Sequence, residues 1–310
     1  MRNAAAELTR RTFAASVAAT LFGADSRYKL GVTTNTRGGW EDDTWLAFRE
    51  AKAAGFDNVE TFIHYFKDAW DKDDPAPIAD RIAEIGVKFV TISNGAPMSM
   101  QFEDPTKHAQ IVKEHVKLAK FVQRLGCTHI KCNAGSRRPN GSTPEDLRNM
   151  ADVYNKIGPR ITDLGMRFAP HAHMWSQFEQ PNEVHYILDN TNPKHVWFVL
   201  DTGHITLAGM DPVKLAKQLG HRVVEFHLKD TKPETKGGAK SRVERNDPIK
   251  DPVFFAMGTS GGVDFPALKD HLESIQWRGW LTCELDSSPM RPPVEGAKIN
   301  RVYMKRVFSI

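Results

Sequence analysis

Short apolar runs alternate with longer amphipathic segments along most of this chain. The eight runs lie at residues 28–34, 57–62, 87–93, 128–133, 166–171, 196–201, 222–228 and 279–285. They are rich in β-branched residues, and each is followed by a segment in which apolar residues recur at helical spacing. This order of strand and helix is typical of a parallel sheet whose strands are connected by crossover helices.

Several helical segments have recognisable ends. We expect Asp104-Pro105 to begin a long helix that ends before Gly126, and Ser142-Thr143-Pro144-Glu145 to begin another. Asp211-Pro212 is expected to begin a third helix, which Gly220 ends. Eight strand–helix units favour a closed barrel over a doubly wound sheet, which uses fewer strands and a GxGxxG turn that does not follow the first strand here. The predicted fold class is therefore α/β, a single-domain (β/α)₈ TIM barrel over residues 25–310.

Residues 1–24 have the pattern of an export signal. Thr9-Arg10-Arg11-Thr12-Phe13 resembles a twin-arginine motif, and an apolar stretch and two small residues follow it. The stretch is too short to span a bilayer, and no other segment approaches that length, so we expect no membrane span in the mature chain. We predict a periplasmic protein. If residues 1–24 are instead an ordinary N-terminal helix, the protein is cytoplasmic.

The composition excludes several classes of protein. Among 310 residues, 40% are hydrophobic and 26% charged, which is sufficient for a folded core. A net charge of +4 is low for a nucleic-acid-binding protein, so we expect no nucleic-acid partner. Three cysteines without a CxxC pair disfavour both a disulfide scaffold and a thiolate zinc site.

Polar residues cluster where six of the predicted strands end. In a barrel of this kind, the loops that follow the strands form the active site. The polar residues recur at every second position, so their side chains point to the same face: Glu60; His129, Lys131 and Asn133; His171 and His173; Asp201; His227 and Lys229; Glu284 and Asp286. Such a pattern on one strand is commonly structural, but six strands that end this way indicate an active site.

Asp201, His227 and Glu284 come from three successive strands and combine two carboxylates with an imidazole. This set suits one divalent ion, Mn²⁺, Mg²⁺, Co²⁺ or Zn²⁺, and His171 can add a fourth ligand. The alternative for each residue is structural: a buried histidine held in one tautomer, an Asx turn or a buried ion pair.

Four segments resemble the xylose isomerase-like TIM barrels, a superfamily of sugar isomerases and epimerases, inosose dehydratases and endonuclease IV. The segments are Leu200-Asp201-Thr202-Gly203-His204, Glu225 to Asp230, Gly258 to Phe265 and Gly279 to Glu284. The resemblance covers essentially the whole mature chain. It implies that Asp201, His227 and Glu284 bind a metal and that His204 contacts substrate.

This chain departs from part of that family at the end of the fifth strand. Ketose 3-epimerases carry a glutamate there, whereas this chain has His171-Ala172-His173. Inosose dehydratases carry a similar histidine cluster, so the resemblance is nearer to that branch. We expect His171 to bind the metal and His173 to contact substrate or transfer a proton, although the sequence also allows the reverse.

A metal-bound keto sugar would lose a proton next to its carbonyl group to form an enediolate. Glu60, Glu284 or His173 is the candidate base, and Lys131 is a candidate to assist it. Return of the proton gives isomerisation or epimerisation, the predicted reaction, whereas loss of a β-substituent gives dehydration or elimination. The candidate substrate-binding residues are Asn133, His204, Lys229, Trp40 and Trp175.

The stretch from Lys229 to Gly262 has no clear periodicity, and we expect a lid or an oligomer contact there. If this stretch is an oligomer contact, the protein is a possible homo-oligomer. The Gly261-Gly262 turn could bind phosphate, but an exported protein seldom meets sugar phosphates, so we expect a non-phosphorylated keto sugar or cyclitol. The rival class is a non-catalytic, exported sugar-binding protein.

Overall fold

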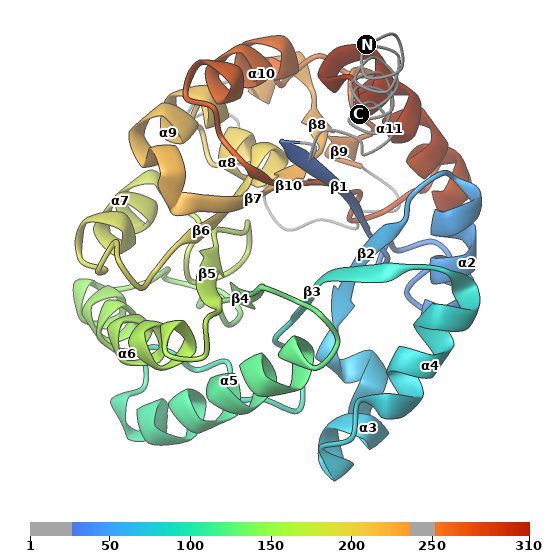
Figure 1. The fold of residues 1–310 in the computed structure, drawn as a ribbon. Coiled ribbons are helices and arrows are strands. Elements are labelled where there is room, and N and C mark those ends of the chain that lie inside the picture. Colours follow the sequence, from blue (N-terminus) through green and yellow to red (C-terminus); the bar gives the residue numbers. More distant parts are fainter. Residues whose placement is uncertain (1–26, 236–251) are drawn as a thin grey trace, which may run out of the picture.

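Eight parallel strands form a nearly closed barrel, with helices around its outside (Figure 1). The computed structural model describes residues 27–235 and 252–310. The barrel strands are β1 (Tyr28–Thr33), β2 (Asn58–Phe62), β3 (Lys88–Ser93), β4 (His129–Asn133), β5 (Arg167–His171), β6 (Phe198–Asp201), β7 (Val223–Leu228) and β10 (Gly279–Cys283). Each lies within two residues of its predicted bounds, so the predicted (β/α)₈ barrel is confirmed.

The strands are paired in the order β3-β2-β1-β10-β7-β6-β5-β4, which leaves β3 and β4 at the two ends of the ladder. Isolated hydrogen bonds connect these two strands. The Thr91 hydroxyl donates to the carbonyl oxygen of His129 at 2.8 Å, and the Asn94 N–H donates to that of Lys131 at 3.4 Å. The barrel therefore closes at this seam without a regular ladder.

The helices of the described residues are α2 (Thr44–Ala53), α3 (Lys67–Lys72), α4 (Ala76–Ile85), α5 (His108–Gln123), α6 (Pro144–Thr162), α7 (Pro181–Asp189), α8 (Thr202–Leu207), α9 (Pro212–Leu219), α10 (Phe265–Ser274) and α11 (Pro293–Phe308). Of the three predicted starts, those of α6 and α9 are confirmed. Thr143 and Asp146 form a capping box at α6, and the Asp211 carboxylate caps α9. One 3₁₀ turn, Pro105–Lys107, precedes α5 in the predicted long helix.

A few small apolar side chains lie in the barrel interior below the strand ends. A small cluster of Ala169, Val199 and Val224 is separate from the main core, which lies between strands and helices. Ala169 and Val199 are two residues before His171 and Asp201, so each pair points to the same side of its strand. Ala169 and Val199 therefore lie beneath the charged residues at the strand ends, at the level of Glu225, which is the ladder partner of Val199.

The stretch from Lys229 to Gly262 contains a short antiparallel ribbon, β8 (Asp230–Thr231) with β9 (Phe254–Phe255). The predicted lid falls in part on residues 236–251, and the predicted export signal on residues 1–24. Both segments lie outside the described residues, so these two predictions stay predictions. Within residues 27–235 and 252–310, no helix is long and apolar enough to cross a membrane.

Candidate metal and carbohydrate site

Charged side chains from six strands meet at the end of the barrel where the strands finish. Glu60, Lys131, His171, Asp201, His227 and Glu284 are each at most 3% exposed. A cavity of about 320 Å³ opens above them, and its lining includes Lys131, His171, His173 and Glu284. The alternation read from the sequence therefore places these candidate residues together.

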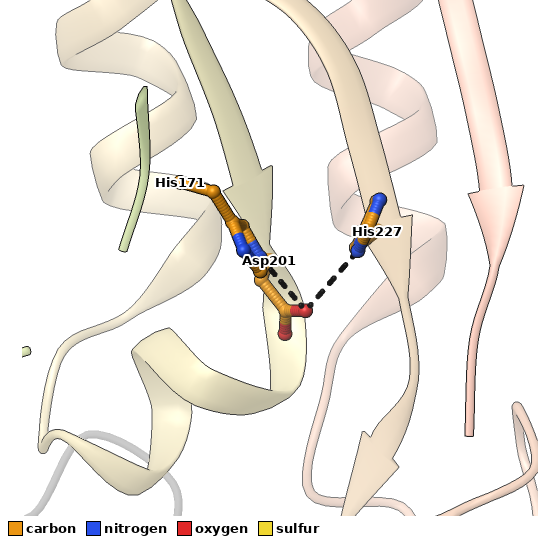
Figure 2. A group of neighbouring side chains, drawn as sticks. All are labelled: His171, Asp201 and His227. Carbon is orange, nitrogen blue, oxygen red and sulfur yellow. Dashed lines mark ion pairs between the residues drawn. The ribbon is translucent and has the colours of Figure 1, made fainter. Parts of the chain in front are cut away.

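His171, Asp201 and His227 form a compact group, in which the Asp201 carboxylate lies between the two imidazoles (Figure 2). Asp201 Oδ2 lies 3.5 Å from His171 Nε2 and 3.7 Å from His227 Nδ1. His171 Nε2 is buried and has no hydrogen-bond partner among the described residues, whereas Asp201 Oδ2 makes no hydrogen bond there but has an ion pair with Lys229 Nζ. Because buried polar atoms without partners are rare, the His171 nitrogen points to a missing ligand.

Asn133 decides which nitrogen of His171 is available. Its Oδ1 lies 2.9 Å from His171 Nδ1, and an amide oxygen only accepts hydrogen bonds. Nδ1 of His171 therefore carries the proton of the neutral ring, and the lone pair on Nε2 faces Asp201. A fixed tautomer of this kind is typical of metal-binding histidines.

Two carboxylates hold His227. Its Nδ1 lies 2.5 Å from Glu284 Oε2, and its Nε2 lies 3.2 Å from Glu60 Oε2. Burial by itself lowers the pKa of His227, but Glu284 and Glu60 outweigh burial and raise this pKa to about 10. A proton on Nδ1 thus supplies positive charge next to Glu284 and Asp201.

Lys229 supplies further positive charge. Its buried Nζ lies 3.1 Å from Asp201 Oδ2, 2.9 Å from Glu284 Oε2 and 2.7 Å from Asp286 Oδ2. Burial lowers the pKa of Lys229, but these carboxylates raise it above its ordinary value. Burial also raises the pKa of Asp201, to about 6, although Lys229 opposes this.

The charges in and below the site fit a divalent cation. Two lysine ammonium groups and the protonated His227 face five carboxylates, which are Glu60, Asp201, Glu225, Glu284 and Asp286. Carboxylate and imidazole donors also suit the ions considered from the sequence. The unpartnered Nε2 of His171 lies beside the Asp201 carboxylate and His227, where such an ion would find ligands, so the residues present fit a metal.

His173, His204 and Asp286 form a neighbouring cluster that is less suited to a metal. The Met174 N–H donates to His204 Nδ1 at 3.2 Å, and His204 Nε2 lies 3.1 Å from Lys229 Nζ and 3.6 Å from Asp286 Oδ1. His173 Nδ1 donates to the carbonyl oxygen of Met174 at 2.6 Å, so the lone pair of the neutral ring is on Nε2. This Nε2 lies 3.6 Å from Asp286 Oδ1 beside the cavity, where it is placed to accept a proton.

Glu60 lies behind His227 and is not part of the cavity lining. Its Oε1 is 2.5 Å from Lys131 Nζ. Burial raises the pKa of Glu60, but Lys131 and His227 together lower this pKa to about 2. The carboxylate is thus held as an anion between two cations, and it contacts a candidate metal ligand rather than the cavity.

The predicted substrate-binding residues lie in different places. Trp175 and Asn133 line the cavity, and both Trp175 Nε1 and Asn133 Nδ2 are buried without a hydrogen-bond partner. His204 and Lys229 lie in the wall behind the lining, where the ring of Phe254 packs against both. Trp40 does not line the cavity. It is 2% exposed, and its Nε1 donates to Glu50 at 2.6 Å.

The sequence marked Asp286 and His129 as strand-end polar residues but gave no role to them or to Glu225. Asp286 lines the cavity, and Glu225 Oε2 lies 2.8 Å from His129 Nε2 below the site. Their signal is the same period of two, since Asp286 follows Glu284 and Glu225 precedes His227 by two positions.

The turn that could hold a phosphate has its donors occupied. The backbone N–H groups of Ser260, Gly261 and Val263 donate to the Asp230 carboxylate at 3.0, 2.7 and 3.1 Å. A phosphate at this turn would have to displace that carboxylate.

A family model described as "Xylose isomerase-like TIM barrel" matches residues 48–307. Among curated proteins, the inosose dehydratase of Clostridium botulinum (strain Eklund 17B / Type B) is 29% identical over 286 residues, covering 88% of this chain and 92% of that protein. The inosose dehydratase of Glaesserella parasuis serovar 5 (strain SH0165) is 27% identical over 252 residues, covering 76% and 83%.

Among solved structures, the IolI protein with a bound zinc atom has a TM-score of 0.68 at 17% identity. The match covers 91% of this chain and 98% of that one. At this identity, the likeness shows the shared fold alone.

Proposed function

Because this chain belongs to the xylose isomerase-like TIM barrel family, we propose that it is a divalent-metal-dependent enzyme that removes a proton next to the carbonyl group of a keto sugar or cyclitol. One observation supports this most directly. The buried His171 Nε2, which has no hydrogen-bond partner among the described residues, lies 3.5 Å from Asp201 Oδ2 at the base of a cavity whose lining includes Lys131, His173 and Glu284.

Four side chains would hold the metal: His171 through Nε2, Asp201, His227 through Nδ1, and Glu284. Mn²⁺, Mg²⁺, Co²⁺ and Zn²⁺ all accept such donors, and one relative in fold was solved with zinc. Such an ion polarises a substrate carbonyl and stabilises the negative charge that develops when the neighbouring proton leaves. Binding would release the proton that His227 carries on Nδ1.

The surrounding side chains position the substrate and move the proton. His173 Nε2 accepts the proton, because the carbonyl oxygen of Met174 fixes the ring with its proton on Nδ1. Lys131 donates a hydrogen bond to a substrate oxygen from the cavity wall. Asn133 and Trp175 offer unpaired N–H groups to substrate hydroxyls. Glu60 acts through His227, whose Nε2–H it accepts.

Two observations favour dehydration as the outcome. The curated relatives named above are inosose dehydratases. In addition, an epimerase needs proton-transfer groups on both faces of the sugar, but Glu60 is buried behind His227 rather than in the cavity lining. Loss of a β-hydroxyl group needs only one proton-transfer group. His173 can accept the proton and then, as the protonated imidazole, donate it to the leaving hydroxyl group.

Isomerisation or epimerisation, the reaction predicted from the sequence, is the second candidate. Glu284 lines the cavity, so a second carboxylate next to a substrate is present. The role of Glu284 in isomerisation or epimerisation depends on whether a bound metal occupies both of its carboxylate oxygens.

We further propose that the substrate carries no phosphate and that the protein is exported. The N–H groups that would bind phosphate already donate to Asp230. The twin-arginine-like pattern of residues 1–24 supports export to the periplasm, where sugar phosphates are scarce. A small-molecule carbohydrate is thus the proposed partner.

The test is incubation of metal-loaded protein with inososes, free keto sugars and 3-keto glycosides in D₂O. An unsaturated product supports the dehydratase, and deuterium incorporation without a new double bond supports the isomerase. Sugar binding with neither result, in the presence or absence of metal, would contradict an enzyme and support the non-catalytic binding protein. His227→Ala serves as the control that lacks a metal ligand.

A further inference from the structure

The loops that follow β4 and β5 are joined beside the cavity. The Arg137 N–H donates to the carbonyl oxygen of Trp175 at 2.9 Å, and the Gln177 N–H donates to that of Gly135 at 3.0 Å. Ser136 and Ser176 form an antiparallel bridge between these bonds. The loop that carries His173 and Trp175 is thus bound to its neighbour through backbone contacts.

Arg137 adds a second connection through its side chain. Its Nε lies 3.0 Å from Glu179 Oε1, and its Nη1 lies 2.9 Å from Glu183 Oε2. Both carboxylate side chains are 2% exposed, so these ion pairs are shielded from solvent. Glu183 Oε2 also accepts the backbone N–H groups of Glu179 and Gln180 at 3.0 and 2.8 Å, where α7 begins. One guanidinium therefore joins the loop after β4 to the start of α7.

Glu179 transmits this connection to Trp175. Its Oε2 accepts the Trp175 backbone N–H, while Oε1 pairs with Arg137. Trp175 has a φ of +66°, in the left-handed region that bulky residues rarely adopt. Such a conformation persists only where the surroundings impose it, and strained residues of this kind are concentrated at functional sites.

The Trp175 indole points to a ligand. It lines the cavity, and its Nε1 is buried without a hydrogen-bond partner among the described residues. A buried N–H group without an acceptor is unfavourable, and an oxygen of a bound molecule would relieve this.

We propose that Arg137 is a positioning residue that, through Glu179 and Glu183, holds the loop after β5 so that Trp175 donates its indole N–H to a substrate oxygen. The acceptor is a hydroxyl or carbonyl oxygen of a polyhydroxylated ring, so this inference rests on the proposed function. Arg137 itself does not line the cavity. Its effect on the reaction is indirect.

Arg138 provides a matched control. Its guanidinium also pairs with two carboxylates, Glu103 and Asp146, at 3.0 Å each, but neither belongs to the loop after β5. We expect Arg137→Ala to increase hydrogen–deuterium exchange of a peptide spanning residues 173–180 by about tenfold or more. Arg138→Ala should leave that peptide unchanged. Arg137→Lys should restore part of the protection, since one ammonium can reach only one of the two carboxylates at a time.

Kinetics with an inosose test the role of the indole. Trp175→Phe keeps the ring but removes the N–H, so KM should rise about threefold to tenfold with loop exchange unchanged. Arg137→Ala should lower kcat/KM by about 100-fold, and added guanidinium should recover part of the loss. Arg138→Ala should keep the wild-type KM.

The proposal is overturned if Arg137→Ala exchanges like wild type, or if Trp175→Phe has the wild-type KM. A wild-type protein that turns over no carbohydrate would refute the proposed function instead. Hydrogen–deuterium exchange of Arg137→Ala and wild type would still decide whether Arg137 holds the loop after β5, because this measurement needs no substrate.

Discussion

The substitution Glu60→Gln distinguishes two roles for the Glu60 carboxylate: general base, as the sequence suggests, and positioning of His227. In the structure, Glu60 Oε2 lies 3.2 Å from His227 Nε2, and Oε1 lies 2.5 Å from Lys131 Nζ. Glutamine keeps the shape and one acceptor oxygen but loses the charge that orients His227. If Glu60 only positions this ligand, the variant should bind metal more weakly and still turn over substrate once metal is saturating.

The expected loss of metal affinity is about 10-fold to 100-fold, as for other partners of metal-binding histidines. This corresponds to about 1.4 to 2.8 kcal/mol of binding free energy. Stability should fall as well, because Lys131 keeps its charge beside a neutral partner. Removal of one member of a buried pair costs about 3–5 kcal/mol, and the remaining amide oxygen should keep the loss near the lower end.

The assay is a metal titration of the chelator-treated protein, followed by calorimetry and by turnover of an inosose. Glu103→Gln is the control, since Glu103 is also buried and pairs with an arginine, but outside the site. A general base would contribute about 10² to 10⁴ to the rate, whatever the metal concentration. A loss of that size at saturating metal, with unchanged metal affinity, would refute the positioning role.

Four further results are expected. His227→Ala should remove both bound metal and activity, and a variant that retains both would contradict the assigned ligand. His173→Gln should bind metal as wild type does but lose at least about 100-fold in kcat, measured at saturating metal. Gly203→Ala should lower the free energy of unfolding by about 1–3 kcal/mol in denaturant titrations, because its Cβ would lie 2.4 Å from Lys229 Cγ; an unchanged midpoint would contradict this close approach. A chelator should lower Tm by about 4–5 °C relative to protein with metal at 100 times Kd, and identical melting curves would argue against a bound ion.

Strand positions were predictable because the strands of a parallel barrel are buried on both faces. β7 illustrates this: all six residues of Val223–Leu228 are buried, and four of them are apolar. The period of two within this strand also placed His227 correctly on the inner face. Helix starts such as Pro144 and Pro212 were predictable for a local reason, since a capping side chain and a proline mark them.

The roles of individual polar residues were less predictable, because they depend on contacts between distant segments. Glu60 and Glu284 are both strand-end glutamates, yet only Glu284 lines the cavity. Similarly, His171 and His173 are separated by a single residue and both have the proton on Nδ1, but Nε2 of His171 faces Asp201 whereas Nε2 of His173 faces Asp286. Trp40 was selected for its place after the first strand, but its indole turns away to Glu50.

The most direct test of the metal site is a crystal structure of metal-loaded protein, with anomalous diffraction recorded at the absorption edge of the ion. We expect one peak within about 2.0–2.3 Å of His171 Nε2, Asp201 Oδ2, His227 Nδ1 and a Glu284 oxygen. A fully occupied ion on His173, His204 and Asp286 instead, or no ion at millimolar metal, would contradict the account.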